Sequence, residues 1–124
     1  MRSLATTILS LAVLLVSSEN PVSAGNVSDV SLKIEKVYAK PVRYNSNGRA
    51  TVIVTLTNTS QYNIRIEGVT CAFYNDGKPV ATALGGATNL QAGEVAVETI
   101  LTMEDVLFNS AGCRVDDVLR SAPN

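Results

Sequence analysis

The chain has 124 residues, a formal net charge of −1 and no histidine. A chain of this length can hold one domain with a single core. The absence of histidine removes the usual general base near neutral pH and histidine-ligated zinc, and the absence of a dense lysine and arginine patch argues against nucleic-acid binding.

The first segment has the composition of a secretory signal peptide. The amino terminus and Arg2 place two positive charges before an uncharged apolar run from Leu4 to Val16, which is shorter than the ~20 residues that span a bilayer. Small residues at positions 22–24 suit a signal peptidase, so we expect residues 1–24 to be removed. The alternative is an uncleaved membrane anchor. Residues 25–124 would then be an exported domain, periplasmic or extracellular, with no further membrane span.

The exported region is rich in valine, isoleucine and threonine, and its apolar and polar residues alternate, which predicts β-strands. The first of these strands begins at Val30. Its apolar phase slips at Lys36, which predicts a β-bulge. After turn residues at 45–48, the segment from Thr51 to Thr57 is the clearest strand. Its hydrophobicity favours a central place in a sheet.

The second half of the chain is divided by glycines and turn residues. Gly68 shifts the phase of an apolar strand, so that Val69, Cys71 and Phe73 share one face. The segment 75–78 contains Asp-Gly and predicts a hairpin turn. We expect another turn at 90–94, one short helical turn within 103–110 that Thr102 caps, and further strands over residues 80–84, 95–101 and 113–119.

About seven short strands, with turns between them and no long helix, predict an all-β fold. The pattern fits a single antiparallel β-sandwich of immunoglobulin-like type. Two cysteines remain in the exported region, Cys71 and Cys113, and an even number in an exported chain predicts a disulfide. The alternative is a pair of separate reactive thiols, although the spacing matches neither a CxxC redox motif nor a zinc site.

The middle of the chain, from Thr51 to Glu94, resembles bacterial exported sandwich domains of the FxLYD type. As in that family, an apolar and aromatic strand runs into an Asp-Gly turn within residues 68–78, and a Leu-x-x-Gly-Glu turn at 90–94 precedes the next strand. The chain departs from the name-giving motif at residues 71–75. The resemblance implies an immunoglobulin-like fold and a non-catalytic accessory or interaction role, and it transfers no functional residues.

No group of residues suits catalysis or cofactor binding. Asp116 and Asp117 are adjacent on a predicted strand, so their side chains should point to opposite faces rather than act together on a substrate. We expect no catalytic residue, no metal site and no cofactor. Tyr44 and Tyr62 lie beside predicted loops and are the candidate partner contacts, because tyrosine is favoured at interfaces. Partial burial in the core is the alternative for both.

The sequence therefore predicts a non-enzymatic exported β-sandwich protein that binds another exported or envelope protein. The first alternative is a small-molecule or carbohydrate-binding module that uses surface tyrosines. The second is a hydrolase that depends on carboxylates.

Overall fold

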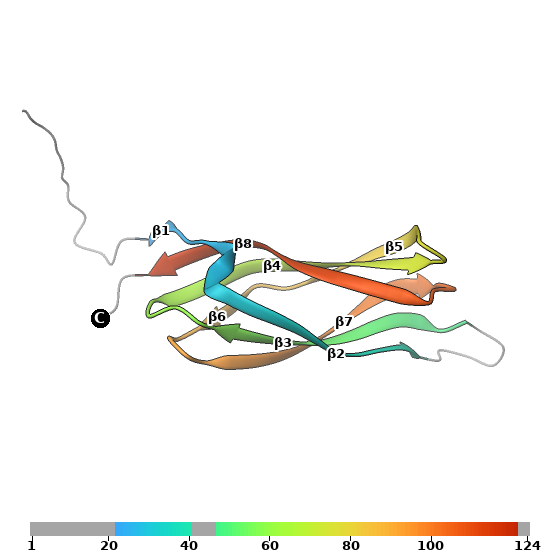
Figure 1. The fold of residues 1–124 in the computed structure, drawn as a ribbon, viewed down its shortest axis with the longest axis horizontal. Coiled ribbons are helices and arrows are strands. Elements are labelled where there is room, and N and C mark those ends of the chain that lie inside the picture. The colour runs from blue at the N-terminus through green and yellow to red at the C-terminus, as the bar shows by residue number, and fades with distance from the viewer. Residues whose placement is uncertain (1–21, 41–46, 122–124) are drawn as a thin grey trace, which may run out of the picture.

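The computed structural model describes residues 22–40 and 47–121, and of residues 22–24 only the backbone. These residues form two antiparallel β-sheets that lie one above the other (Figure 1). The elements are β1 (Val22–Ala24), the 3-10 turn η1 (Val27–Asp29), β2 (Val30–Lys40), β3 (Arg49–Asn58), β4 (Asn63–Asn75), β5 (Lys78–Gly85), β6 (Thr88–Leu90), β7 (Val95–Asp105) and β8 (Ser110–Ser121).

The strand order decides which strands are central and which are edges. One sheet has the order β1-β8-β4-β5, with β6 paired to the first part of β4, and the other has the order β2-β3-β7. β3 is therefore central, as predicted for residues 51–57. Within the described residues, β2 and β7 are the edges of the three-stranded sheet, and β5 is an edge of the larger one.

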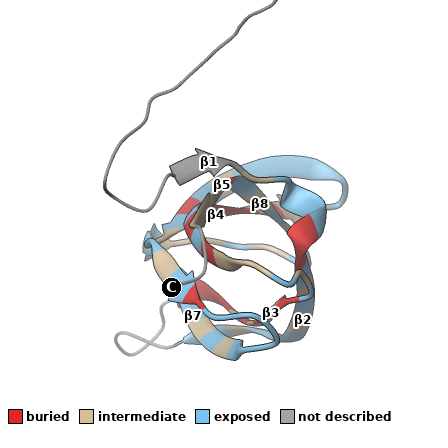
Figure 2. Ribbon diagram, turned by 90° about the vertical axis from the view of Figure 1, so that its left-hand side faces the viewer, coloured by how far each residue is buried: buried red, intermediate tan, exposed pale blue. Residues whose placement is uncertain are grey.

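The core lies between the two sheets, where the buried segments face each other (Figure 2). In β3, the fully buried Val52, Val54 and Leu56 alternate with half-buried residues, because successive side chains of a strand point to opposite faces. Phe73 contributes the largest fully buried side chain, and its ring meets Phe108 edge to face at 5.4 Å between centroids. The further fully buried apolar residues, none more than 1% exposed, are Ala50, Ile66, Val69, Cys71, Ile100 and Val118.

The irregular positions expected from the sequence are confirmed. The β2–β3 register shifts between Ile34 and Lys36, which is the predicted bulge. The β4–β8 register shifts on both sides of Gly68, so that the buried phase passes from Ile66 to Val69. Asp76 and Gly77 have φ values of 50° and 82° and form the predicted turn between β4 and β5.

The predicted helical turn within 103–110 is wrong. β7 continues to Asp105, which pairs with Arg49, and residues 106–109 form a loop. The hydroxyl of Thr102, expected to cap a helix, instead accepts a hydrogen bond from the backbone N–H of Ala50 at 3.1 Å and donates to the carbonyl of Glu104 at 2.8 Å. Pairing with β3 overrides the local capping preference.

The predicted disulfide is confirmed, and it joins neighbouring strands of one sheet. Cys71 on β4 pairs directly with Cys113 on β8, with their Cα atoms 4.0 Å apart. Both cysteines described are in this bond. The bond therefore holds the register of β4 against β8 and does not connect the two sheets.

The predicted signal peptide falls largely on residues 1–21, outside the described residues. Its last three residues form β1, which pairs with residues 119–121 of β8. The next residue, Gly25, donates its backbone N–H to the carbonyl of Val118 at 2.8 Å. Among the described residues, no helix is long and apolar enough to cross a membrane.

Candidate partner-binding surface

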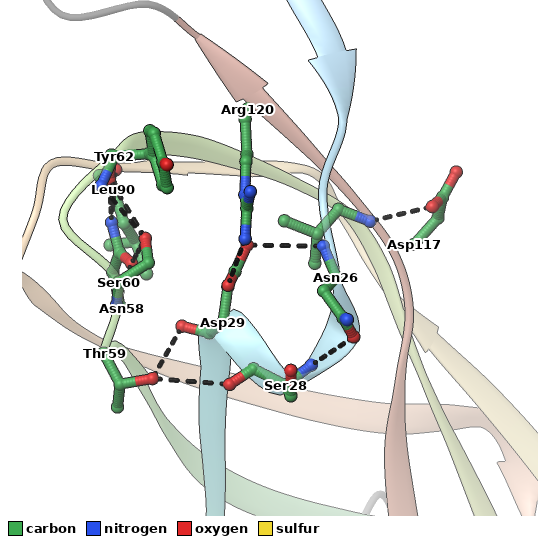
Figure 3. Close-up of polar contacts among 11 residues, drawn as sticks. Asn26, Ser28, Asp29, Asn58, Thr59, Ser60, Tyr62, Leu90, Asp117 and Arg120 are labelled. Atoms are coloured by element: carbon green, nitrogen blue, oxygen red, sulfur yellow. Dashed lines mark hydrogen bonds and ion pairs between the residues drawn. The ribbon is translucent and has the colours of Figure 1, made fainter.

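A group of polar side chains lies at the end of the molecule where β1 pairs with β8 (Figure 3). Arg120 on β8 donates two hydrogen bonds to Asp29 at the end of η1, from Nε to Oδ2 at 2.9 Å and from Nη2 to Oδ1 at 3.0 Å. The guanidinium carbon of Arg120 lies 4.3 Å from the ring centroid of Tyr62, in a cation–π contact. The backbone N–H of Asn26 donates to Asp29 as part of a capping box.

These contacts favour the charged form of the Asp29 carboxyl. The hydrogen bond from Arg120 is the largest cause, and it lowers the pKa of Asp29 below its ordinary value against the opposing effect of burial. The bond to the N–H of Asn26 and the charge of Arg120 act in the same direction. The same pairing raises the pKa of Arg120.

Asn58 is the second centre of this polar group, and its side chain is fully buried. Its amide nitrogen donates to the carbonyls of Tyr62 at 2.7 Å, Gln91 at 3.0 Å and Leu90 at 3.2 Å. Its amide oxygen accepts from the backbone N–H and the hydroxyl of Ser60. Asn58 thus ties the loop after β3 to the end of β6, and its hydrogen-bonding capacity is used inside the domain.

The two candidate tyrosines have different outcomes. Tyr44 lies outside the described residues. Tyr62 is half-buried, and one of its faces is in contact with Arg120. Tyr62 therefore has a place in the fold, while its role as a partner contact stays a prediction.

The adjacent carboxylates on β8 have separate partners. Asp116 accepts a hydrogen bond from the hydroxyl of Thr70 at 2.6 Å and pairs with Arg114 at 3.2 Å. Asp117 accepts from the backbone N–H of Val118 at 2.9 Å. The chain bulges here, since Gly68 is opposite Asp117 and Val69 is opposite Val115. In the described parts of the chain, no cluster of three or more histidine, cysteine or acidic residues could hold a metal ion.

A cleft of about 570 Å³ lies between β5 and the end of β7. Three of its lining residues, Val80, Met103 and Leu107, are large apolar side chains that solvent reaches. The other lining residues are Asn75, Ala81, Thr82, Thr102, Glu104, Asp105 and Val106. The cleft therefore combines an apolar surface with acidic groups.

Exposed apolar side chains are concentrated on these same elements. The described residues include eight large hydrophobic side chains that are exposed, and six of them lie on β5, on β7 or in the loop after β7. We call these six the β5–β7 apolar set: Val80, Leu84, Val95, Val97, Met103 and Leu107. The other two, Val27 and Val37, lie on η1 and β2.

Sequence reasoning missed this set because both phases of β7 contain apolar residues. Val95 and Val97 alternate with Ala96, and the fully buried Ile100 belongs to the opposite phase from the two valines. The sequence therefore contained a signal for this set, namely a strand with apolar residues on both faces.

Comparison of the chain with protein-family models, with curated proteins and with solved structures finds no match.

Proposed function

We propose that this chain is a non-enzymatic, exported module that binds another exported or envelope protein through its β5–β7 side. One observation carries the proposal: six of the eight exposed large hydrophobic residues described lie on β5, β7 and the loop after β7. Three of the six, Val80, Met103 and Leu107, line one cleft. Burying apolar surface away from water stabilises a complex by about 25 cal/mol per Å², and exposed apolar surface of this kind is typical of interaction sites.

We further propose that the two sheets form an immunoglobulin-like sandwich. The order β2-β3-β7 corresponds to strands A, B and E of that fold, and β5-β4-β8 corresponds to C′, C and F. β1 then lies beside β8 where the last strand of the fold would pair. FxLYD-type domains, which the middle of the sequence resembles, would share this fold, and the resemblance implies a binding role.

Two features support export. The amino-terminal segment has the charge and apolar pattern of a signal peptide, and the Cys71–Cys113 bond suits an oxidising compartment. Cleavage after Ala24 would remove β1 and leave the bond between Gly25 and Val118 in place. The domain would keep both sheets.

The cleft gives weaker support to the carbohydrate-binding alternative. Carbohydrate recognition through tyrosine needs an accessible aromatic face, and none of the described tyrosines lines the cleft. The apolar side chains there are not aromatic, and that of Met103 is flexible, which suits contact with a protein better.

The test is site-specific photo-cross-linking of the full chain in the cells that produce it. We expect a photoreactive residue in place of Met103 to give an adduct with one defined protein, identified by mass spectrometry. The matched control is the same residue in place of Val37, an exposed apolar position on β2 that lies outside the set. Equal adducts at both positions, or none at Met103, would contradict the proposed function.

A further inference from the structure

The edge strands differ in how they are protected from pairing with another chain. β2 carries Lys33, Lys36 and Lys40 together with a bulge, and β5 begins with Lys78 and Pro79. Lysine, proline and bulges are the usual means by which proteins block a sheet edge. β7 is eleven residues long and contains neither lysine, arginine nor proline, and its register with β3 is irregular near its end, between the pairs Thr51–Leu101 and Arg49–Asp105. Residues 95–101 are therefore the regular and unprotected part of this edge.

β7 also has one unpaired side along its length. Its pairing with β3 extends from the carbonyl of Glu94, which accepts from Asn58, to the N–H of Val106, which donates to the carbonyl of Gly48. Within the described residues, no strand pairs with its other side. Strand addition at such an edge gains backbone hydrogen bonds.

The surface beside this edge is apolar. The side chains of Val95, Val97 and Met103 are 55%, 65% and 86% exposed, and they alternate along β7 with residues that face the core. An added strand would place its own outward side chains next to them, and each pair would remove apolar surface from water.

The charges along β7 are all acidic. Glu98, Glu104 and Asp105 lie on the strand, and Glu94 precedes it. No ion pair joins Glu94, Glu98 or Glu104 to a basic side chain of the described residues. Glu98 accepts a hydrogen bond from Thr88 through Oε2 at 2.8 Å, whereas its Oε1 is buried without a hydrogen-bond partner. The exposed Glu94 and Glu104, at the two ends of β7, therefore make this edge complementary to basic groups.

The same charges disfavour a second copy of the chain as the occupant. In an antiparallel pair of β7 strands centred on Thr99, Glu94 of one copy would face Glu104 of the other. Like charges directly opposite each other destabilise a strand pair. A second β7 strand is therefore disfavoured as the occupant of this edge.

We propose that β7 takes up an extended segment in which apolar residues alternate with lysine or arginine, adding a fourth strand to the β2-β3-β7 sheet. This inference rests on the proposed function and names the partner's chemistry. Backbone hydrogen bonds hold the segment, its apolar residues cover Val95 and Val97, and its basic residues meet the carboxylates.

The first experiment measures binding of a labelled nine-residue peptide of alternating valine and lysine to the full chain. The comparison peptide has glutamate in place of lysine. We expect the lysine peptide to bind at least tenfold more tightly, with an affinity that falls as salt is raised. In hydrogen exchange, the bound peptide should protect β7 amides and leave the β2 amides unchanged.

Two variants and one control locate the contact. Val97→Lys adds to β7 the protection that β2 already has, and we expect binding to fall at least tenfold. Glu104→Gln should weaken binding of the lysine peptide about threefold, as expected for one exposed ion pair. Val37→Lys on β2 is the matched control and should bind as the unaltered chain does, with thermal unfolding showing that every variant is folded.

Equal affinity for both peptides, or protection at a strand other than β7, would overturn the inference. The two proposals fail separately. If Met103 gives an adduct but the lysine peptide binds no better than the glutamate peptide, the proposal of a basic added strand is wrong, while the proposed binding function stands. Absence of the adduct removes the binding function itself.

Discussion

Asp29 and Arg120 are 91 positions apart in the sequence, and their contact closes the end of the molecule where η1 meets β8. The carboxylate is nearly buried, whereas the guanidinium is partly exposed, with side-chain exposures of 9% and 31%. Arg120 is also in contact with the ring of Tyr62. A bidentate pair in this setting is geometrically more defined than an exposed ion pair, because both hydrogen bonds and the aromatic face orient the guanidinium.

Replacing Asp29 with asparagine should lower the free energy of unfolding at pH 7 by about 2 kcal/mol, since a hydrogen bond to a charged group is lost. Folding lowers the pKa of Asp29 below its ordinary value of 3.8. Its stabilisation is therefore complete above that value and is lost as the pH falls through the lower folded pKa. Urea unfolding should show the gap between the chain and Asp29→Asn narrowing below about pH 4.

The control for Asp29 is Glu67→Gln, which removes a more exposed ion pair with Arg65. That substitution should change stability by less than about 0.5 kcal/mol at pH 7. A constant gap between the chain and Asp29→Asn from neutral to acid pH would contradict the assigned role of Asp29.

Replacement of Asn58 by a residue with a carboxylate side chain should strongly destabilise the fold. Asn58→Asp would place acceptor oxygens against three backbone carbonyls that now receive hydrogen bonds from the amide. We expect a loss of about 3 kcal/mol or more, because buried polar groups would be left unpaired. Asn89→Asp, at an exposed position on β6, is the matched change and should stay within about 0.5 kcal/mol in thermal or urea unfolding.

At the scale of the elements, local sequence patterns were sufficient to predict those features of the strands that depend on neighbouring residues. The bulge at Lys36, the phase change at Gly68 and the Asp76-Gly77 turn each depend on residues next to one another, and all three are confirmed. The end of β7 depends on pairing with Arg49, more than fifty positions earlier, so the pattern around Thr102 predicted a helical turn that does not form.

Local sequence patterns could not predict the polar contacts or the β5–β7 apolar set either, because both depend on residues that are distant in the sequence. No residue near Arg120 in the sequence indicates that Asp29 is its partner. Asn58 lies just beyond the predicted strand 51–57, although it ends β3 with a fully buried side chain. The exposure of Val95 and Val97 follows from which face of β7 meets the core. Only the three-dimensional arrangement of the sheets decides that face.

Loss of the disulfide should weaken the fold without changing its topology. The bond closes a loop between residues 42 positions apart, for which the chain-entropy relation gives about 4 kcal/mol. The double variant Cys71→Ala and Cys113→Ala should therefore unfold at clearly lower urea concentration while keeping its β-sheet circular dichroism. Alkylation of both cysteines in the unreduced chain, or unchanged stability of the variant, would contradict the structural role of the bond.

At the scale of the whole molecule, processing of the amino terminus decides whether β1 is present. We expect intact-mass measurement of the exported protein to give a chain that begins at Gly25. The backbone bond between Gly25 and Val118 would then mark the start of the folded domain. An exported chain that still begins at Met1 would exclude cleavage.

The position of the disulfide also determines how the domain would respond to mechanical force. After cleavage the chain would begin at Gly25, whose backbone bonds to Val118 on β8, so tension applied through Gly25 and the end of β8 would act on neighbouring segments of the domain (Figure 1). The disulfide would prevent the segment between Cys71 and Cys113 from extending. For a separation of 42 residues, that segment has a fully extended length of ~150 Å. A reducing agent would release that length, so the same module would extend much further in a reducing compartment than outside the cell.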